Sequence, residues 1–264
     1  MTVLRVEGLT KVFGGLAALQ DASVAVERGK IEALIGPNGA GKTTFFNCIS
    51  GQLRPDAGRV VLDGREMTGA PPYRMAEQGL ARTFQNLELF SDLTVLQNVL
   101  VGRHLRMTAG PFSSMVRLPR ERSDERRARK AAVGALDRVG LADRAARLVG
   151  ELPYGEQRLV EVARALALEP SVLLLDEPAA GLSAAEADGL GDLVRGIAAE
   201  QVGVVLVEHD MRTVMALADE ITVLDAGEII AVGPPAEIRA DPAVIAAYLG
   251  VEDSGSLDAI VDLS

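Results

Sequence analysis

Eight consecutive residues near the N-terminus have the composition and spacing of a phosphate-binding loop. From Gly36 to Thr43 the chain reads Gly-Pro-Asn-Gly-Ala-Gly-Lys-Thr, which fits the pattern G-x-x-x-x-G-K-[ST]. Glycines let successive backbone N–H groups turn inward around phosphate oxygens, and a helix starting after Gly41 adds its positive dipole end. Lys42 would then reach the β- and γ-phosphates, and the Thr43 hydroxyl would bind Mg²⁺. The residues expected to bind the nucleotide here are Gly36, Pro37, Asn38, Gly39, Ala40, Gly41, Lys42, Thr43 and Thr44.

The segments on either side of this loop suit a strand-to-helix junction. Residues 31–35 are mostly apolar and lead straight into Gly36, and the glycines stop where residues 42–50 begin a helical stretch. We expect the stem of Lys42 to make few core contacts at this junction. Cys48, on the same helix, is interpreted as a core residue.

Two acidic residues follow a second buried strand. Residues 172–175 form a short continuous apolar run, and Asp176 and Glu177 come directly after it. Ligands of α/β proteins bind at the carboxyl ends of parallel strands. We therefore expect Asp176 to hold Mg²⁺ and Glu177 to polarise the attacking water. The alternative is a pair of solvated loop acids, which the nearby phosphate loop disfavours.

A third apolar run, residues 202–207, is followed by Glu208 and His209. A lone histidine is more often a packing or surface residue, but this one ends a strand at the same sheet edge as Asp176. His209 is therefore a candidate contact for the γ-phosphate, and we count it with Lys42 and Glu177 as catalytic. His104 has no such context and receives no role.

The remaining patterns predict an α/β fold with a parallel sheet core, an N-terminal antiparallel β layer and an inserted helical subdomain. Alternating strands and turns fill the N-terminal part, and helical spacing dominates the subdomain at about 92–158. Residues 120–130 mix both charge signs and suit a solvated helix face better than a nucleic-acid patch. Ser183 and Glu186 have capping-box spacing, and residues 221–232 suit a hairpin. The domain is expected at 1–250, followed by an acidic tail at 251–264.

Composition narrows the classes of protein. Of 264 residues, 48% are apolar and 24% charged, as in globular proteins. A net charge of −10, with 3% aromatic residues and no Trp, argues against nucleic acid as a partner. One cysteine excludes an internal disulfide, and two histidines leave few ligands for a zinc site. No apolar run approaches the roughly 20 residues of a membrane span, and no signal-peptide core is present. We expect a soluble protein linked to the membrane only through another protein.

Further motifs resemble those of ABC ATPases, in the family's order from Val3 to Gly250. The resemblance implies that Phe13 stacks on adenine and that Gln85 meets Mg²⁺ and senses a membrane subunit. It also implies that residues 180–183 form a dimer-facing loop and that His209 is the switch histidine. The signature residues, expected to contact ATP bound by a partner chain, are Pro153, Tyr154, Gly155, Glu156 and Gln157.

This resemblance implies a P-loop NTPase fold with a RecA-like core that binds ATP and Mg²⁺. Two such chains would dock head-to-tail and work with membrane permease subunits at the cytoplasmic side of the cell membrane. The segments 150–158, 176–182, 207–211 and 241–250 look most like ATPase subunits of branched-chain (hydrophobic) amino-acid importers. Importers of urea or other small solutes share these cues.

Two motifs depart from the family pattern. The signature usually has serine where this chain has Pro153 and glycine where it has Tyr154, and the dimer-facing loop usually ends in Asp where Ser183 stands. Because Pro153 lacks a hydroxyl for the partner's γ-phosphate, we expect a different second ATPase subunit in the transporter.

Two other functional classes stay open at this point. A soluble ABC ATPase acting on DNA, ribosomes or cluster assembly would not bind permeases, and a pull-down with membrane subunits tests this. A P-loop kinase of a small metabolite would transfer phosphate to an acceptor instead of releasing it to water, and it would lack the signature and the switch histidine.

Overall fold

The computed structural model describes residues 1–83, 87–103 and 119–249. The chain forms two compact units. The first unit combines residues 1–82 with 171–264, and the second consists of residues 83–170.

The first unit is built on a six-stranded sheet of order β10-β9-β3-β8-β7-β6. Neighbouring strands are parallel except for the β9–β10 hairpin at one edge. Every residue of β3, β7 and β8 is buried, as expected of apolar runs covered on both faces. The strands are β3 (Ile31–Ile35), β6 (Leu80–Arg82), β7 (Val172–Asp176), β8 (Gly203–Val207), β9 (Glu220–Asp225) and β10 (Glu228–Gly233).

The register of the parallel strands brings the predicted functional segments to one edge of the sheet. Asp176 at the end of β7 pairs with Val207 at the end of β8, and Ile35 at the end of β3 pairs with Val223 of β9. The segments that begin at Gly36, Glu177 and Glu208 therefore leave the sheet at its carboxyl edge.

A four-stranded antiparallel sheet of order β2-β1-β4-β5 forms the N-terminal layer. The helix α1 (Lys42–Ile49) packs in a core cluster that joins this layer to β3, β7 and β8, and its Phe45 and Phe46 are fully buried. Its strands are β1 (Thr2–Phe13), β2 (Leu16–Glu27), β4 (Ala57–Leu62) and β5 (Arg65–Glu66).

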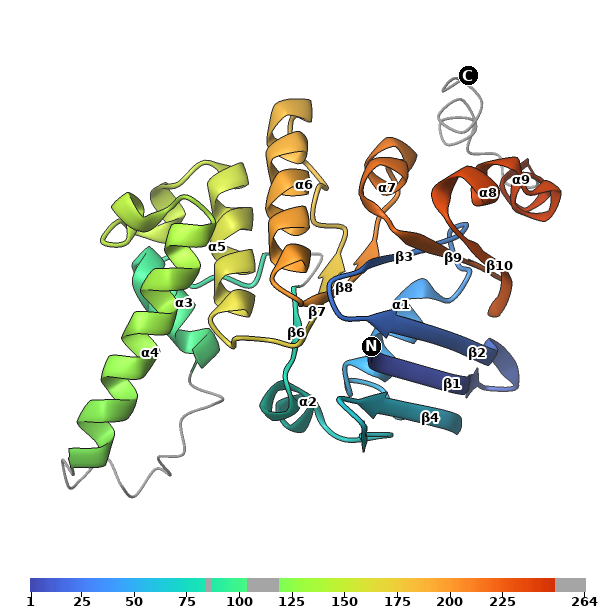
Figure 1. Cartoon of the computed structure of the whole chain (residues 1–264), viewed down its shortest axis with the longest axis horizontal. Helices are drawn as coiled ribbons and strands as arrows, with labels where there is room; N and C mark the ends of the chain where they lie inside the picture. The colour runs from blue at the N-terminus through green and yellow to red at the C-terminus, as the bar shows by residue number, and fades with distance from the viewer. Residues whose placement is uncertain (84–86, 104–118, 250–264) are drawn as a thin grey trace. The chain divides into compact units, whose positions relative to one another are not determined.

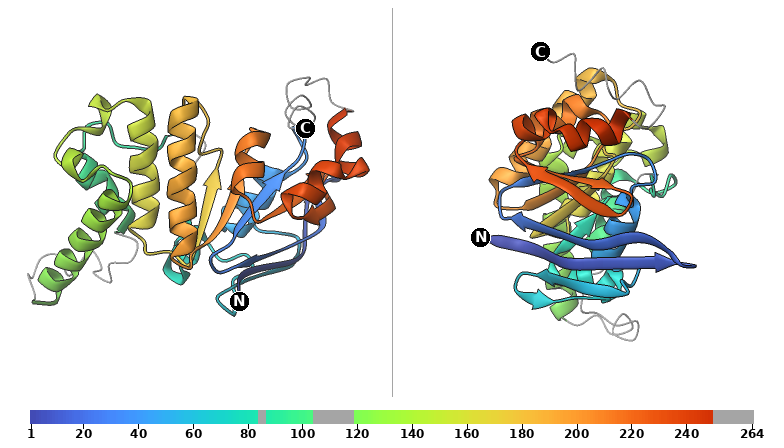
Figure 2. Two further views of the ribbon diagram at one scale, coloured as in Figure 1. Left: turned by 45° about the horizontal axis from the view of Figure 1, so that its top comes forward. Right: turned by 90° about the vertical axis from the view of Figure 1, so that its right-hand side faces the viewer.

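Helices cover the other side of the six-stranded sheet (Figures 1 and 2). Ser183 and Glu186 form the expected capping box, with both reciprocal hydrogen bonds, at the start of α6. A second core cluster joins α7, α8 and α9 to β3 and β9. The helices on this side are α6 (Ala184–Ala199), α7 (Met211–Leu217), α8 (Pro235–Ala240) and α9 (Pro242–Leu249).

A short helix, α2 (Pro72–Gln78), precedes β6, and the sequence patterns did not predict either element. The three residues of β6 are too few to show a periodicity.

The second unit is helical, with α3, α4 and α5 packed on one another. On α4, residues 125–127, 129 and 130 are exposed while Ala128 and Ala132 are buried. The part of the charged segment whose side chains are described is therefore a solvated helix face, as expected. The elements are α3 (Val95–Arg103), α4 (Pro119–Arg138), the short helices η3 (Ala142–Arg144) and η4 (Val149–Glu151), and α5 (Tyr154–Leu166). None of the helices described here is long and apolar enough to cross a membrane.

Candidate nucleotide site

Two glycines, Gly36 and Gly41, let the backbone of the phosphate loop pack closely against neighbouring backbone segments. Gly36 has φ 151° and Gly41 has φ 107°. A Cβ atom on Gly36 would lie 1.9 Å from the carbonyl oxygen of Leu224, and one on Gly41 would lie 2.5 Å from that of Ala18. Any other residue at either position would displace the loop, so the close backbone approach depends on glycine.

The start of α1 presents free backbone donors beside this loop. The first hydrogen bond that closes a turn of the helix runs from Phe45 N to Gly41 O, at 2.9 Å. The amides of Lys42, Thr43 and Thr44 thus have no partner within the helix, and no side chain caps α1. No acidic residue lies in the first turn to compete for an anion. These features fit the phosphates of ATP.

Lys42 is buried, with 7% of its surface exposed, so our expectation of few core contacts is wrong. Its ammonium donates hydrogen bonds to Gly36 O at 2.5 Å and Pro37 O at 2.9 Å. Burial lowers the pKa of Lys42, and the negative charge of Glu177 opposes that shift. Glu177 is thus close enough to Lys42 for their charges to interact, and the loop carbonyls hold the ammonium beside the phosphate loop.

Glu177 and His209 meet at the carboxyl edge of the sheet. Nε2 of His209 lies 2.6 Å from Oε1 of Glu177, and the Glu177 N–H donates to Val207 O at 2.9 Å. The Glu177 side chain is 16% exposed and that of His209 is 51% exposed. The pair therefore joins the ends of β7 and β8, with the histidine on the solvent side.

Glu208 organises these two loops, although its sequence context assigned it no role of its own. Its carboxylate accepts hydrogen bonds from Ala179 N at 2.8 Å and from His209 N at 3.1 Å. The residue is buried, and burial raises its pKa. Because one carboxylate holds both backbones, the loop after Glu177 and the residue His209 are fixed relative to each other.

Phe13 lies at the tip of the β1–β2 hairpin and is 48% exposed. Lys11 Nζ lies 5.5 Å from the centroid of its ring and also donates to Arg54 O and to Asp56 Oδ1, both at 3.0 Å. In the same hairpin, the backbone of Ala18 lies close to the backbone of Gly41 in the phosphate loop. The ring is therefore a supported, accessible aromatic surface on a strand pair that touches the phosphate loop.

A Mg²⁺ ion at this site would be bound by a hydroxyl, a carboxylate and the phosphates of the nucleotide, and not by a cluster of carboxylates. Within the described part of the chain, no three His, Cys, Asp or Glu side chains are grouped to hold a metal. The donors at this edge, the Thr43 hydroxyl and the Asp176 carboxylate, are oxygens of the kind Mg²⁺ prefers together with substrate phosphates. Thr43 is exposed and Asp176 is 7% exposed. This donor set fits a nucleotide-bound Mg²⁺. Gln85 lies outside the described residues.

The signature residues belong to the second unit. Pro153 stands at the N-cap of α5 with φ −55° and makes no side-chain cap bond. Pro153 and Tyr154 are exposed, Gly155 is buried, and Glu156 and Gln157 are half-buried. Gln157 Nε2 donates to Leu152 O at 2.9 Å, which ties the motif to the preceding turn. The motif thus opens a helix, as its position in the sequence predicted.

Tyr248 on α9 is a further neighbour of the phosphate loop that sequence reasoning missed. Burial raises the pKa of its hydroxyl to about 12, and a hydrogen bond from the Gly36 backbone opposes that shift. No local pattern marks the residue, because its proximity to Gly36 depends on how α9 packs.

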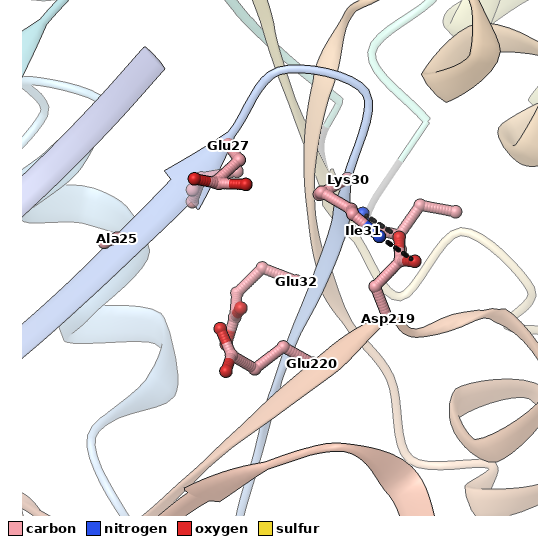
Figure 3. A pocket seen from close by; sticks show the side chains of 8 residues that line it. Ala25, Glu27, Lys30, Ile31, Glu32, Asp219 and Glu220 are labelled. Atoms are coloured by element: carbon pink, nitrogen blue, oxygen red, sulfur yellow. Dashed lines mark hydrogen bonds and ion pairs between the residues drawn. The ribbon is translucent and has the colours of Figure 1, made fainter. Parts of the chain in front are cut away.

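A pocket of about 350 Å³ lies away from these residues, where β3 and β9 begin (Figure 3). Its lining includes Glu27, Lys30, Glu32, Asp219 and Glu220. This end of the sheet is opposite the carboxyl edge where α/β proteins bind ligands, so we separate it from the nucleotide site.

Comparison with known proteins identifies the family. The family model described as ABC transporter matches residues 19–180. The chain belongs to the ABC transporter family. A second model, described as branched-chain amino acid ATP-binding cassette transporter, matches residues 228–254 of this ABC ATPase.

Named relatives and a solved structure agree with this placement. The chain is 43% identical to the high-affinity branched-chain amino acid transport ATP-binding protein BraF of Pseudomonas aeruginosa, over 94% of this chain and 98% of BraF. It is 42% identical to the corresponding protein LivG of Salmonella typhimurium over the same shares. A crystal structure of an ATP-binding cassette of an ABC transporter, in its ADP conformation, has a TM-score of 0.82 and 31% identity, covering 95% of this chain and all of that one.

Membership fixes the general activity and the fold. The protein is the ATP-binding, ATP-hydrolysing subunit of an ABC transporter and acts in a complex with permease components. Its antiparallel N-terminal sheet and mostly parallel core match the predicted fold class.

Proposed function

We propose that this ABC ATPase drives import of branched-chain and other hydrophobic amino acids. The observation that carries the solute class is the match of residues 228–254 to the branched-chain amino acid model. The relatives BraF and LivG, which are named for that transport, support it over nearly their whole length. This ATPase subunit acts on ATP and not on the solute, so the assignment depends on the whole transporter.

The proposed nucleotide site uses the loop and helix start described above. Backbone amides at the start of α1 bind the phosphates, and Lys42 moves its hydrogen bonds from the loop carbonyls to phosphate oxygens. Phe13 offers one ring face to adenine while Lys11 supports the ring. Mg²⁺, when bound, neutralises charge on the phosphates, and Thr43, Asp176 and Gln85 are the residues we expect to hold it.

Hydrolysis is assigned to Glu177 and His209. Glu177 takes the proton of the attacking water as it adds to the γ-phosphorus. The 2.6 Å contact with His209 Nε2 orients the carboxylate and leaves His209 near the terminal phosphate. Lys42 stabilises the charge that develops on the leaving oxygens.

We further propose a head-to-tail pairing with a second, different ATPase subunit, on permeases at the cytoplasmic face of the membrane. Each ATP would then lie between one chain's phosphate loop and the other chain's signature helix. Pro153 gives the proposed asymmetry its basis, because it offers neither a hydroxyl nor an N–H.

Reconstitution tests the solute. The chain would be placed in proteoliposomes with the permeases, second ATPase and binding protein encoded beside its gene, and uptake of labelled leucine, valine, urea and ribose compared. We expect ATP-dependent uptake of leucine and valine that is lost with the Glu177→Gln chain. Uptake of urea or ribose without leucine or valine would refute the amino-acid assignment and leave the ATPase assignment standing.

A further inference from the structure

Arg82, the last residue of β6, connects two parts of the nucleotide site. Its Nη2 donates to Asp176 Oδ2 at 2.8 Å, at the end of β7. Its Nη1 donates to Asn47 Oδ1 at 2.8 Å and to Ser50 Oγ at 2.9 Å. The side chains of Arg82 and Asp176 are only 8% and 10% exposed. One guanidinium therefore bonds the end of a central strand to the α1 segment.

The acceptors near α1 share a face of the helix with a proposed metal ligand. Residues 43, 47 and 50 are spaced four and three apart, so Thr43, Asn47 and Ser50 fall on the same side of α1. The guanidinium also lies 5.5 Å from the centroid of the Phe46 ring, which limits its movement. Arg82 thus holds the Asp176 carboxylate toward the helix face that carries Thr43.

A buried ion pair of this kind needs a structural or functional reason. Removing two charges from water is costly, and their attraction offsets this only when geometry and further hydrogen bonds are good. Arginine suits the task because its planar fork donates in fixed directions, whereas lysine is a flexible point charge.

We propose that Arg82 is a positioning residue for the nucleotide-bound Mg²⁺, holding Asp176 in register with Thr43. The inference rests on the proposed function, in which Asp176 and Thr43 hold that ion. In this proposal Arg82 acts through Asp176 and not by contact with the ion or the phosphates. Its contribution is to fix the distance between two ligands that are 133 residues apart in sequence.

The test measures the Mg²⁺ requirement of nucleotide binding, not turnover. A fluorescent ATP analogue would be titrated onto the full-length chain in EDTA and at increasing free Mg²⁺. Arg82→Lys keeps the buried charge balanced but loses the fork, so we expect the Mg²⁺ concentration for half-maximal binding to rise about tenfold. Affinity in EDTA should stay within about twofold, since Asp176 does not bind phosphate. The tenfold rise corresponds to about 1.4 kcal/mol, which is the size of effect expected when a charge-assisted hydrogen bond loses its favourable geometry.

Two variants test the parts of this arrangement. Asn47→Leu removes one acceptor on α1 without touching the ion pair, and we expect a smaller rise, about threefold, in the same direction. Arg59→Lys, at an exposed arginine paired with Glu66, is the matched control and should change nothing. Melting temperatures establish that each variant is folded.

The outcomes separate the inference from the function on which it rests. An unchanged Mg²⁺ requirement in folded Arg82→Lys overturns the inference, and so does equal weakening with and without Mg²⁺, which marks a general defect. If Asp176→Asn raises the requirement and Arg82→Lys does not, only the Arg82 inference fails. If Asp176→Asn leaves it unchanged, the proposed metal role of Asp176 fails as well.

Discussion

The backbone at Glu177 lies in the left-handed region, with φ 47°. For a residue with a side chain this conformation costs on the order of 1–3 kcal/mol and persists only where neighbours enforce it. Here the Glu177 N–H is bonded to Val207 O, and Glu208 holds the next turn at Ala179. The turn directs the Glu177 carboxylate to His209.

Glu177→Gln should leave ATP binding nearly unchanged and slow hydrolysis by about 10²–10⁴-fold, because the amide cannot take the proton of water. Single-turnover phosphate release and analogue binding measure the two effects separately. Since bound ATP then persists, the variant should also pair with ATP more readily than the parent chain.

Glu125→Gln, at an exposed glutamate of α4, is the control and should behave as the parent. If hydrolysis by Glu177→Gln falls less than tenfold, Glu177 is not the base.

The functional residues that the sequence could reveal are those in short motifs. Asp176 ends the buried strand β7, Glu177 follows it, and His209 comes two residues after the end of β8. Their place at the shared carboxyl edge could therefore be predicted from their position in the chain. Arg82 and Glu208 act through partners 94 and 29 residues away. No local pattern encodes such contacts, because they depend on how the strands are ordered in the sheet.

The helix α5 is capped by Pro153, at a position where the family usually has serine. Pro153→Ser should raise ATP turnover by the purified chain about ten- to a hundredfold, since a hydroxyl would contact the γ-phosphate bound by a second copy. A steady-state phosphate assay on the chain alone measures this.

Pro71→Ser is a close control, because Pro71 is also an N-cap without a side-chain bond, at the start of α2. Any helix-capping gain should appear in both variants, and a gain in turnover only in Pro153→Ser. An unchanged rate in Pro153→Ser, with full activity of the parent as a homodimer, would exclude the asymmetric pairing.

Glu32 is a buried carboxyl group near the start of β3, at the end of the strand away from the phosphate loop (Figure 3). Burial raises its pKa to about 7, the Thr222 hydroxyl bond opposes this, and the charge of Glu220 adds to it. Glu27, Asp219 and Lys30 also line this pocket, and Lys30 is paired with Asp219 at 2.9 Å. The folded state therefore favours a protonated Glu32.

The free energy of unfolding should accordingly fall as pH rises from about 4.5 to about 7, by an amount on the order of 3 kcal/mol at most. Glu32→Gln keeps an acceptor for Thr222 and removes the titration, so it should be more stable than the parent at pH 8 and little changed at pH 4.5. Urea unfolding at both values measures this difference. Equal shifts at the two pH values would contradict it, and the exposed Glu228→Gln should show no shift at either.

Elements with strong patterns could be predicted from sequence, and weakly patterned ones could not. The continuous apolar runs gave β3, β7 and β8, and the capping box gave the start of α6. The strand β6 has three residues and takes its place only through parallel pairing with β7.

The six-stranded sheet combines strands from the N-terminal and C-terminal parts of the chain. β6 ends at Arg82 and pairs with β7, which begins at Val172, so all of the second unit lies within one parallel crossover. The sheet cannot be completed until the residues on both sides of that insertion are available. We expect the sequence-distant contacts of β7, including Asp176 with Arg82, to form late in folding.

The reactivity of the single cysteine, Cys48, can be used to measure how often α1 opens. Cys48 lies inside α1, is 2% exposed, and burial raises the pKa of its thiol to about 11. At pH 8 it should carry about two orders of magnitude less thiolate than an unhindered cysteine, and a colorimetric thiol reagent should react only when α1 opens. Reaction should be immediate in concentrated guanidinium and slow in buffer. It should be slower again with ATP and Mg²⁺, which bind the closed form. A cysteine introduced on the surface for a spectroscopic label would then be modified without background from the native thiol.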